Sequence, residues 1–386
     1  VADIPGDSAY DRNKYREGWR KVAYEGIRRM MSAVKGGFAA SVGVILFTLP
    51  VQLWFFYEIP VYSVLLNLLV LPFMSAVVAG GILSLIPGLG IVGTVDCLIL
   101  WWYEWICERF GELPGAVWCV GQPEIWQIAC YYAGIFLLVF GRRYVEAWKR
   151  RGTYGEENVP GVIIHSNRFQ HQIATVMILG LLIGLLTGNF DRGSRVTFLD
   201  VGQGDGIVVE TGQGAYLFDC GSTSRKNIGE YVLKPYLKSR GICSLRGVFV
   251  SHPDEDHMNG VLELLENGEE WGITAEQLFL PAIRESERRE TFEQLLAAAE
   301  DAGIPVSYIK CGDEIRDSQL RLLCLHPEEN TTLADANAYS ECFYVEVFAK
   351  KMKQEAIDDR KANDASGGSA IGKISILLTG DVEGEG

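Results

Sequence analysis

Long apolar runs dominate residues 1–188 of the chain. A helix needs about 20 apolar residues to cross a bilayer. Five runs approach that length: Gly36–Tyr57, Val61–Ile86, Ile91–Cys107, Ile125–Phe140 and Ile173–Gly188. We expect all five to be membrane spans. The third also contains Asp96, Glu104 and three tryptophans, so it fits an amphipathic helix in the membrane interface equally well.

Basic side chains flank these runs and set an expected topology. One group precedes the first run and a second follows the fourth: Arg12, Lys14, Arg16, Arg20, Lys21, Arg28, Arg29 and Lys35, then Arg142, Arg143, Lys149, Arg150 and Arg151. Loops rich in Lys and Arg stay in the cytoplasm. The fifth run then delivers residues 189–386 to the outer side. Both basic groups lie on the cytoplasmic side only if the third run crosses the membrane, because four crossings then separate them.

From Arg195 the pattern changes to short strand-like runs, most of which end in Gly, Pro or His. They are Arg195–Gly202, Gly206–Gly212, Ala215–Gly221, Gly247–His252, Gln277–Pro281, Leu320–His326, Cys342–Ala349 and Ile374–Asp381. Two stretches, Ile228–Ser239 and Thr291–Ala302, have helical periodicity. Strands mixed with helices predict an α/β sandwich of sheets flanked by helices. We expect two domains, a helical transmembrane bundle at 1–188 and an α/β domain at 189–386. The polar stretch Lys350–Lys373 predicts an exposed hairpin insertion.

Charge is divided unevenly between these two regions. Residues 1–188 carry 15 basic and 14 acidic side chains, whereas residues 189–386 carry 20 and 35. An acidic surface argues against nonspecific gripping of nucleic acid, but not against a nucleic acid held at a metal. Nine cysteines without a C-x-x-C pair argue against a zinc ribbon or a disulfide framework. We expect Cys97, Cys107, Cys119 and Cys130 to pack as small hydrophobic side chains.

The stretch SHPDEDH holds two of the five histidines of the chain. It follows a buried-type strand and precedes an apolar helix, so its imidazoles and carboxylates should meet at one edge of the sheet. His252, Asp254, Asp256 and His257 together suit divalent ions of borderline hardness, which activate water for hydrolysis. The alternative is a solvated acidic loop with an incidental histidine pair, and the density of ligand types disfavours it.

SHPDEDH resembles the H-x-[HD]-x-D-H signature of the metallo-β-lactamase superfamily. Phe198–Glu210 (FLDVGQGDGIVVE), Tyr216–Gly221 (YLFDCG) and Leu377–Asp381 (LLTGD) resemble strand motifs of one branch, the ComEC-type DNA internalisation proteins of natural competence. Phe47–Phe73 resembles the competence membrane domain of that family. The resemblance extends from about Tyr10 to Asp381. It implies an αββα sandwich for the second domain.

The resemblance also implies roles for individual residues. His252, Asp254, Asp256, His257 and Asp381 match metal ligands of two divalent ions, with Asp381 as the bridge and Asp256 and His257 as catalytic residues. Because Asp254 replaces a histidine of many relatives, manganese is as plausible as zinc. Asp205, Asp219, Asn337 and Ser340 are candidates for the rim of the site, and Asp219 is expected to brace a ligand. Asp200 and Gln203 share the Asp205 loop, and we read His326 as structural.

The function that the resemblance implies is DNA uptake across the cytoplasmic membrane during transformation. One strand would pass through a membrane channel, and an outer metal-dependent nuclease would degrade the other. Implied partners are DNA, membrane lipid, a DNA receptor, a cytosolic translocase and further copies of the chain. Two alternatives remain, a membrane-anchored metallohydrolase of phosphoesters and a channel with a non-catalytic metal module. The family places a histidine motif after Asp381, so with the chain ending at Gly386 we expect an incomplete site and a fragment lacking both ends.

Overall fold

The computed structural model describes residues 9–141, 144, 168–189, 193–284, 288–328, 340–348 and 373–381. They form two compact units. One unit comprises Val1–Gln52 and Glu58–Trp118, and the other comprises Leu53–Tyr57 and Cys119–Gly386. The domain boundary at residues 188 and 189 stays a prediction. The insertion Lys350–Lys373 lies, apart from Lys373, outside the described residues.

The first unit is built from apolar helices. They are α1 (Ala9–Phe56), which extends into the second unit, α2 (Ser63–Ser84) and α3 (Gly90–Gly111). In the part of the chain that the structure describes, Tyr24–Phe56, α2 and α3 are long and apolar enough to cross a membrane. The third apolar run therefore forms a continuous helix, although its membrane crossing stays a prediction.

Helices α2 and α3 pack against each other at several points, two of which involve polar side chains. Tyr103 Oη donates a hydrogen bond of 2.9 Å to the carbonyl oxygen of Val70. Asp96 is 8% exposed and lies against Gly80, where a side chain would collide with its carboxylate. Glu104 is exposed, so Asp96 and Glu104 have different surroundings.

The second unit begins with a helical pair, α4 (Ile125–Phe136), which continues as a π-helical turn to Gly141, and α6 (Arg168–Thr187). Their apolar parts are shorter than those of α2 and α3. Buried Gln127 joins them, because its Nε2 donates hydrogen bonds to the carbonyl oxygens of Leu185 (2.7 Å) and Gly188 (2.8 Å).

Two sheets follow α6. The seven-stranded sheet has the order β3-β4-β5-β6-β8-β9, with β7 paired to β6. Strands β3 to β5 are antiparallel neighbours, whereas β5, β6, β8 and β9 run parallel. Their bounds are β3 Arg195–Phe198, β4 Gly206–Thr211, β5 Gly214–Cys220, β6 Ser244–Phe249, β7 Thr274–Ala275, β8 Leu278–Pro281 and β9 Val306–Ile309. The four-stranded sheet is antiparallel: β10 Glu314–Arg316, β11 Leu320–His326, β12 Cys342–Phe348 and β13 Lys373–Leu378.

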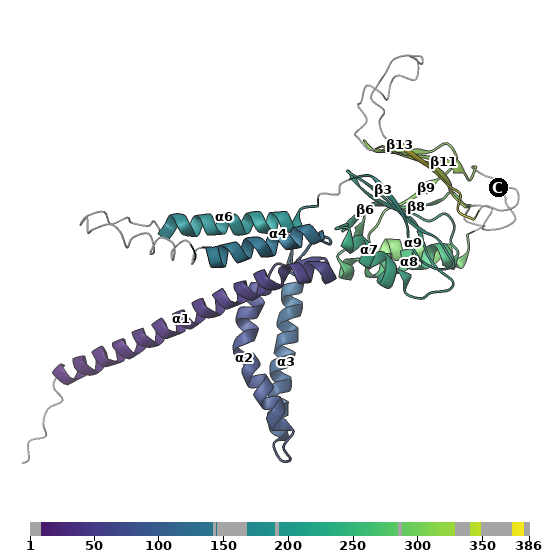
Figure 1. Ribbon diagram of the computed structural model, residues 1–386. Helices are drawn as coiled ribbons and strands as arrows, with labels where there is room; N and C mark the ends of the chain where they lie inside the picture. The colour runs from purple at the N-terminus through teal and green to yellow at the C-terminus, as the bar shows by residue number, and fades with distance from the viewer. Residues whose placement is uncertain are drawn as a thin grey trace, which may run out of the picture. The chain divides into compact units, whose positions relative to one another are not determined.

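Three layers result (Figure 1), in which the seven-stranded sheet lies between the four-stranded sheet and the helices. These helices are α7 (Lys234–Ser239), α8 (Glu255–Trp271) and α9 (Glu290–Asp301). Aromatic and aliphatic side chains together fill the space between the sheets, where Phe218 and Phe249 stack at 4.6 Å between ring centroids. Aliphatic side chains fill the space between sheet and helices. The predicted strands and both predicted helices are present, and the described layers are a β, β, α part of the expected αββα sandwich.

Candidate metal centre

Imidazole and carboxylate side chains gather where strands of both sheets end. Asp219 lies near the end of β5, His252 follows β6, His257 lies in the first turn of α8, and Asp381 follows β13. Parallel β5 and β6 carry their carboxyl ends to the same edge, which is where α/β folds place ligand-binding groups. The site therefore sits on rigid elements of both sheets.

Two overlapping groups bring possible metal-binding atoms together. One atom each from His252, His257 and Asp381 lie within 4.8 Å of one another, as do atoms from Asp205, Asp219 and His257. The rings of His252 and His257 lie 4.1 Å apart between centroids. His257 belongs to both groups and is the centre of the arrangement.

Asp219 fixes the orientation of His257. Its carboxylate accepts hydrogen bonds from Ser251 N–H and Ser251 Oγ–H, both at 2.7 Å, and faces His257 Nδ1 at 3.1 Å. An Nδ1–H donated to Asp219 leaves Nε2 of His257 for the site, where it lies 3.4 Å from Asp381 Oδ2. A carboxylate behind an imidazole is the usual support of a metal-binding histidine.

His252 has an equivalent support made of hydroxyls. Its Nδ1 lies 3.0 Å from Ser340 Oγ and 3.2 Å from Ser251 Oγ. Because the Ser251 hydroxyl donates a hydrogen bond to Asp219, its oxygen accepts a hydrogen bond from His252 Nδ1–H. Nε2 of His252 is therefore unprotonated and keeps its lone pair. Both imidazoles thus present Nε2 to the site. All three side chains, His252, Ser251 and Ser340, are buried.

Glycines let the loop before β4 approach the start of α8. Asp205 N–H donates to the carbonyl oxygen of Asp256 (3.0 Å), and Gly221 N–H donates to that of Asp205 (2.9 Å). Gly204 has φ +145°, and a Cβ there would lie 2.5 Å from the oxygen of Asp256. A Cβ on Gly221 would lie 2.5 Å from the oxygen of Glu255. Only glycine fits these contacts, which explains the glycines of the sequence motif.

Burial and the neighbouring carboxylates shift the pKa values of the histidines in opposite directions. Burial lowers the pKa of His257, but its hydrogen bond to Asp219 and the charges of Asp219, Asp381 and Asp256 outweigh burial and raise this pKa to about 9. For His252, burial and the neighbouring His257 lower the pKa. Burial is also the main cause of a raised pKa at Asp205. The metal-free site thus holds one protonated imidazole at neutral pH.

A cavity of about 180 Å³ lies beneath the site between the two sheets. Its polar lining includes Asp205, Asp219, Ser251 and Glu341. Glu341 is 1% exposed, and neither of its carboxyl oxygens has a hydrogen-bond partner among the described residues. Burial raises the pKa of Glu341 well above its ordinary value, which favours the neutral form of this carboxyl group.

Not every expected site residue joins the two groups. Asp254 Oδ2 is 4.0 Å from His252 Nε2, while its Oδ1 pairs with Arg289 Nη1 at 3.3 Å. Asp256 reaches the site through its backbone carbonyl, and its side chain is in neither group within the described part of the chain. Asn337 lies outside the described residues. Sequence reasoning gave no role to Ser251, although it directly precedes the first histidine.

The outer members of the loop motif stay away from the centre. Asp200 is exposed and pairs with Arg225 at 3.4 Å, and Gln203 binds the Ser224 hydroxyl through its N–H. His326 ends β11 and is in neither ligand group of the described residues.

The donor set fits divalent metal. Neutral imidazole nitrogens and carboxylate oxygens bind zinc and other divalent first-row ions. Here three such atoms already converge without any rearrangement, and hydrogen bonds hold the imidazoles from behind. The residues present therefore suit a metal ion at His252, His257 and Asp381.

Comparison with known families agrees with this geometry. Residues 12–144 match the Competence protein family, and residues 199–307 match the Metallo-beta-lactamase superfamily. One region of the chain is thus similar to competence proteins and the other to metallo-β-lactamase domains. Folds of this superfamily indicate a metal-dependent hydrolase that binds divalent ions.

Two curated proteins are similar over long stretches. ComE operon protein 3 of Bacillus subtilis is 24% identical over 88% of this chain and 40% of its own length. Recombination protein 2 of Haemophilus influenzae is 25% identical over 59% of this chain and 30% of its own length. The chain spans well under half of the length of either relative. Among solved structures, the metallo-β-lactamase BJP-1 of Bradyrhizobium japonicum is 14% identical over 49% of this chain and 61% of its own, with a TM-score of 0.28.

Proposed function

We propose that this protein takes part in DNA uptake during transformation, as a membrane protein whose metallo-β-lactamase domain hydrolyses one DNA strand. The observation that supports this most is the convergence of His252, His257 and Asp381 in a chain whose other region is apolar helices. The similarity to competence proteins supports the DNA substrate. The apolar helices would cross the cytoplasmic membrane several times, and the metal domain would face the outer side.

Phosphodiester hydrolysis suits the proposed metal ligands. A divalent ion held by His252, His257 and Asp381 would polarise a phosphoryl oxygen and acidify a water. We assign zinc or manganese to this role, with a second ion near Asp256 and Asp381. The protein supplies the remaining steps.

The side chains around the ligands orient them and handle protons. Asp219 holds the proton of His257 at Nδ1, so that Nε2 is directed at the substrate side. Ser340 and Ser251 hold His252 in the same way. Asp205 places a carboxylate beside His257, where it can take up a proton released by water. Asp219, Ser251 and Ser340 are buried, which keeps these supports away from bulk water.

The test uses the full-length protein purified in detergent. Linear duplex DNA and a small phosphodiester are incubated with zinc or manganese, and cleavage is measured for the wild type and for Asp256→Ala/Asp381→Ala. The proposal expects metal-dependent DNA cleavage that the double variant loses. Cleavage of the small phosphodiester alone would contradict the proposal and indicate a membrane-anchored phosphoesterase. No hydrolysis of either substrate with metal bound would leave a non-catalytic module.

A further inference from the structure

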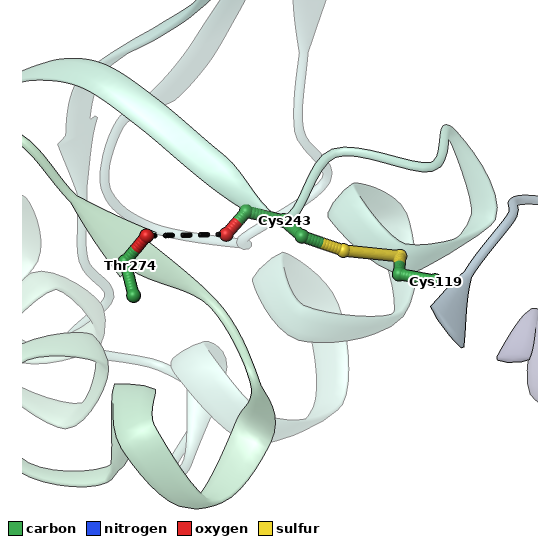
Figure 2. Close-up of a disulfide and its surroundings, with 3 residues drawn as sticks. All are labelled: Cys119, Cys243 and Thr274. Carbon is green, nitrogen blue, oxygen red and sulfur yellow. Dashed lines mark hydrogen bonds between the residues drawn. A yellow bond between two sulfur atoms is a disulfide. The ribbon is translucent and has the colours of Figure 1, made fainter. Parts of the chain in front are cut away.

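A disulfide joins two segments of the second unit that are far apart in the sequence. Cys119 ends β2 (Val117–Cys119), and Cys243 directly precedes β6 (Figure 2). Their Cα atoms are 6.6 Å apart, within the span of a disulfide. This corrects the expectation that Cys119 packs only as a small hydrophobic side chain.

The backbone around both cysteines is built for close contact. Gly121 and Gly241 have φ values of +96° and +70°, a region that favours glycine. A Cβ on Gly241 would lie 2.7 Å from the carbonyl oxygen of Val120, and one on Gly121 would lie 3.0 Å from the nitrogen of Gly241. Gln122 N–H also donates to the carbonyl oxygen of Ser239 at 2.7 Å. These contacts bring the two sulfur atoms together independently of the covalent bond.

Both sides of the bond are anchored. The carbonyl oxygen of Cys243 accepts hydrogen bonds from Thr274 N–H (2.9 Å) and Thr274 Oγ1 (3.4 Å, Figure 2), which tie it to β7. On the other side, residues 119–124 lead into α4, which Gln127 fastens to the end of α6. The bond therefore fastens the metallo-β-lactamase domain to the start of the α4–α6 pair.

We propose that Cys119 and Cys243 are an oxidative modification site. The oxidant that forms their disulfide is a disulfide-donating thiol oxidoreductase outside the cytoplasmic membrane. One thiolate attacks the oxidant disulfide and forms a mixed disulfide, and the second thiolate displaces the oxidant as a dithiol. Two thiol protons and two electrons leave the protein, and the oxidant takes up both. Disulfides persist in oxidising compartments and are rare in the cytosol. The inference rests on the outer location in the proposed function and makes that location testable.

The test counts accessible thiols on intact cells that express the full-length protein. A membrane-impermeant maleimide attached to polyethylene glycol is added before or after a membrane-impermeant phosphine reductant, and added mass is measured by gel electrophoresis. In the wild type, the reductant should expose two further thiols. In Cys119→Ser, it should expose none, because Cys243 reacts beforehand. Exposed Cys311 is not disulfide-bonded and reports access without reductant.

Two labelling outcomes would overturn the disulfide or its outer location. Equal labelling of the wild type with and without reductant would show free thiols and overturn the disulfide. Labelling of Cys311 and of the pair only after lysis would overturn the outer location, whereas DNA cleavage by the purified protein would be unaffected. If Cys119→Ser fails to accumulate, mass spectrometry of alkylated, unreduced wild-type protein replaces it. Tryptic peptide Gly241–Arg246 should then appear linked to the peptide with Cys119, and an alkylated Cys243 in its place would refute the inference.

Discussion

Replacing Asp219 with asparagine should weaken metal binding without unfolding the protein. Asparagine keeps the size of the side chain and tolerates the left-handed backbone at this position, where φ is +51°. Its amide oxygen can still accept the 2.7 Å hydrogen bond from Ser251 N–H. Its amide NH₂ cannot accept a hydrogen bond from His257 Nδ1–H. His257 would then turn to the tautomer with the proton on Nε2, the atom that faces Asp381.

The size of the effect follows from the role of the carboxylate. Removing the partner behind a metal-binding histidine lowers metal affinity about 10- to 100-fold, or about 1.4–2.7 kcal/mol. The wrong tautomer adds to this loss, so we expect the upper end. Asp219→Ala should also destabilise the fold by about 1–3 kcal/mol, because it leaves the buried Ser251 N–H without its acceptor.

Titration calorimetry with zinc, performed on the full-length protein after chelation, measures the effect. Asp200→Asn is the matched control, since Asp200 is exposed, pairs with Arg225 and lies in the same loop as Asp205. The control should bind zinc as the wild type does. If Asp219→Asn also binds zinc with unchanged affinity, the orienting role of Asp219 is wrong.

Three further predictions concern pH, packing and substrate binding. Because the pKa of metal-free His257 is about 9, a metal ion must displace a proton from it at pH 7, so metal affinity should rise with pH and level off above about 9. Calorimetry in buffers of different ionisation enthalpy should show the release of about one proton on metal binding. A binding enthalpy that does not depend on the buffer would contradict this prediction. Gly221→Ala should push the start of α8 away, abolish metal binding and cost about 1–3 kcal/mol of unfolding free energy, whereas Gly303→Ala, where space is open, should cost about 1 kcal/mol and leave metal binding intact. We expect Arg289, which pairs with Asp254 beside His252, to contact a DNA phosphate; Arg289→Gln should then raise KM for DNA and reduce the salt slope by about one charge, whereas the control Arg225→Gln should change neither, and an unchanged slope in both would contradict this contact.

Much of the fold and part of the site could be read from local patterns. Strand periodicity found β3 to β6 because apolar side chains alternate or run continuously along them. Strands β9 and β10 were missed because three or four residues carry too little pattern. His252 and His257 were found because they lie only five positions apart in the sequence, so no knowledge of distant contacts was needed.

Contacts between distant segments could not be read in this way. The proximity of Asp381 to His257 was expected only from the family resemblance, since residues 124 positions apart in sequence have no local signal. Cys119 and Cys243, also 124 positions apart, had no spacing rule to pair them. The pairing of Asp254 with Arg289 depends on how α8 and α9 pack, because each residue directly precedes one of these helices, and no motif contains that packing.

The most direct test of the account measures DNA cleavage against metal concentration. The full-length protein, its Asp381→Ala variant and the exposed-site control Asp301→Ala would be compared on linear duplex DNA after removal of bound metal. We predict that added zinc or manganese restores cleavage in the wild type and the control, and that Asp381→Ala stays about 100-fold or more below them at saturating metal. Equal cleavage by Asp381→Ala, or cleavage that persists in a chelator, would contradict a metal centre at His252, His257 and Asp381.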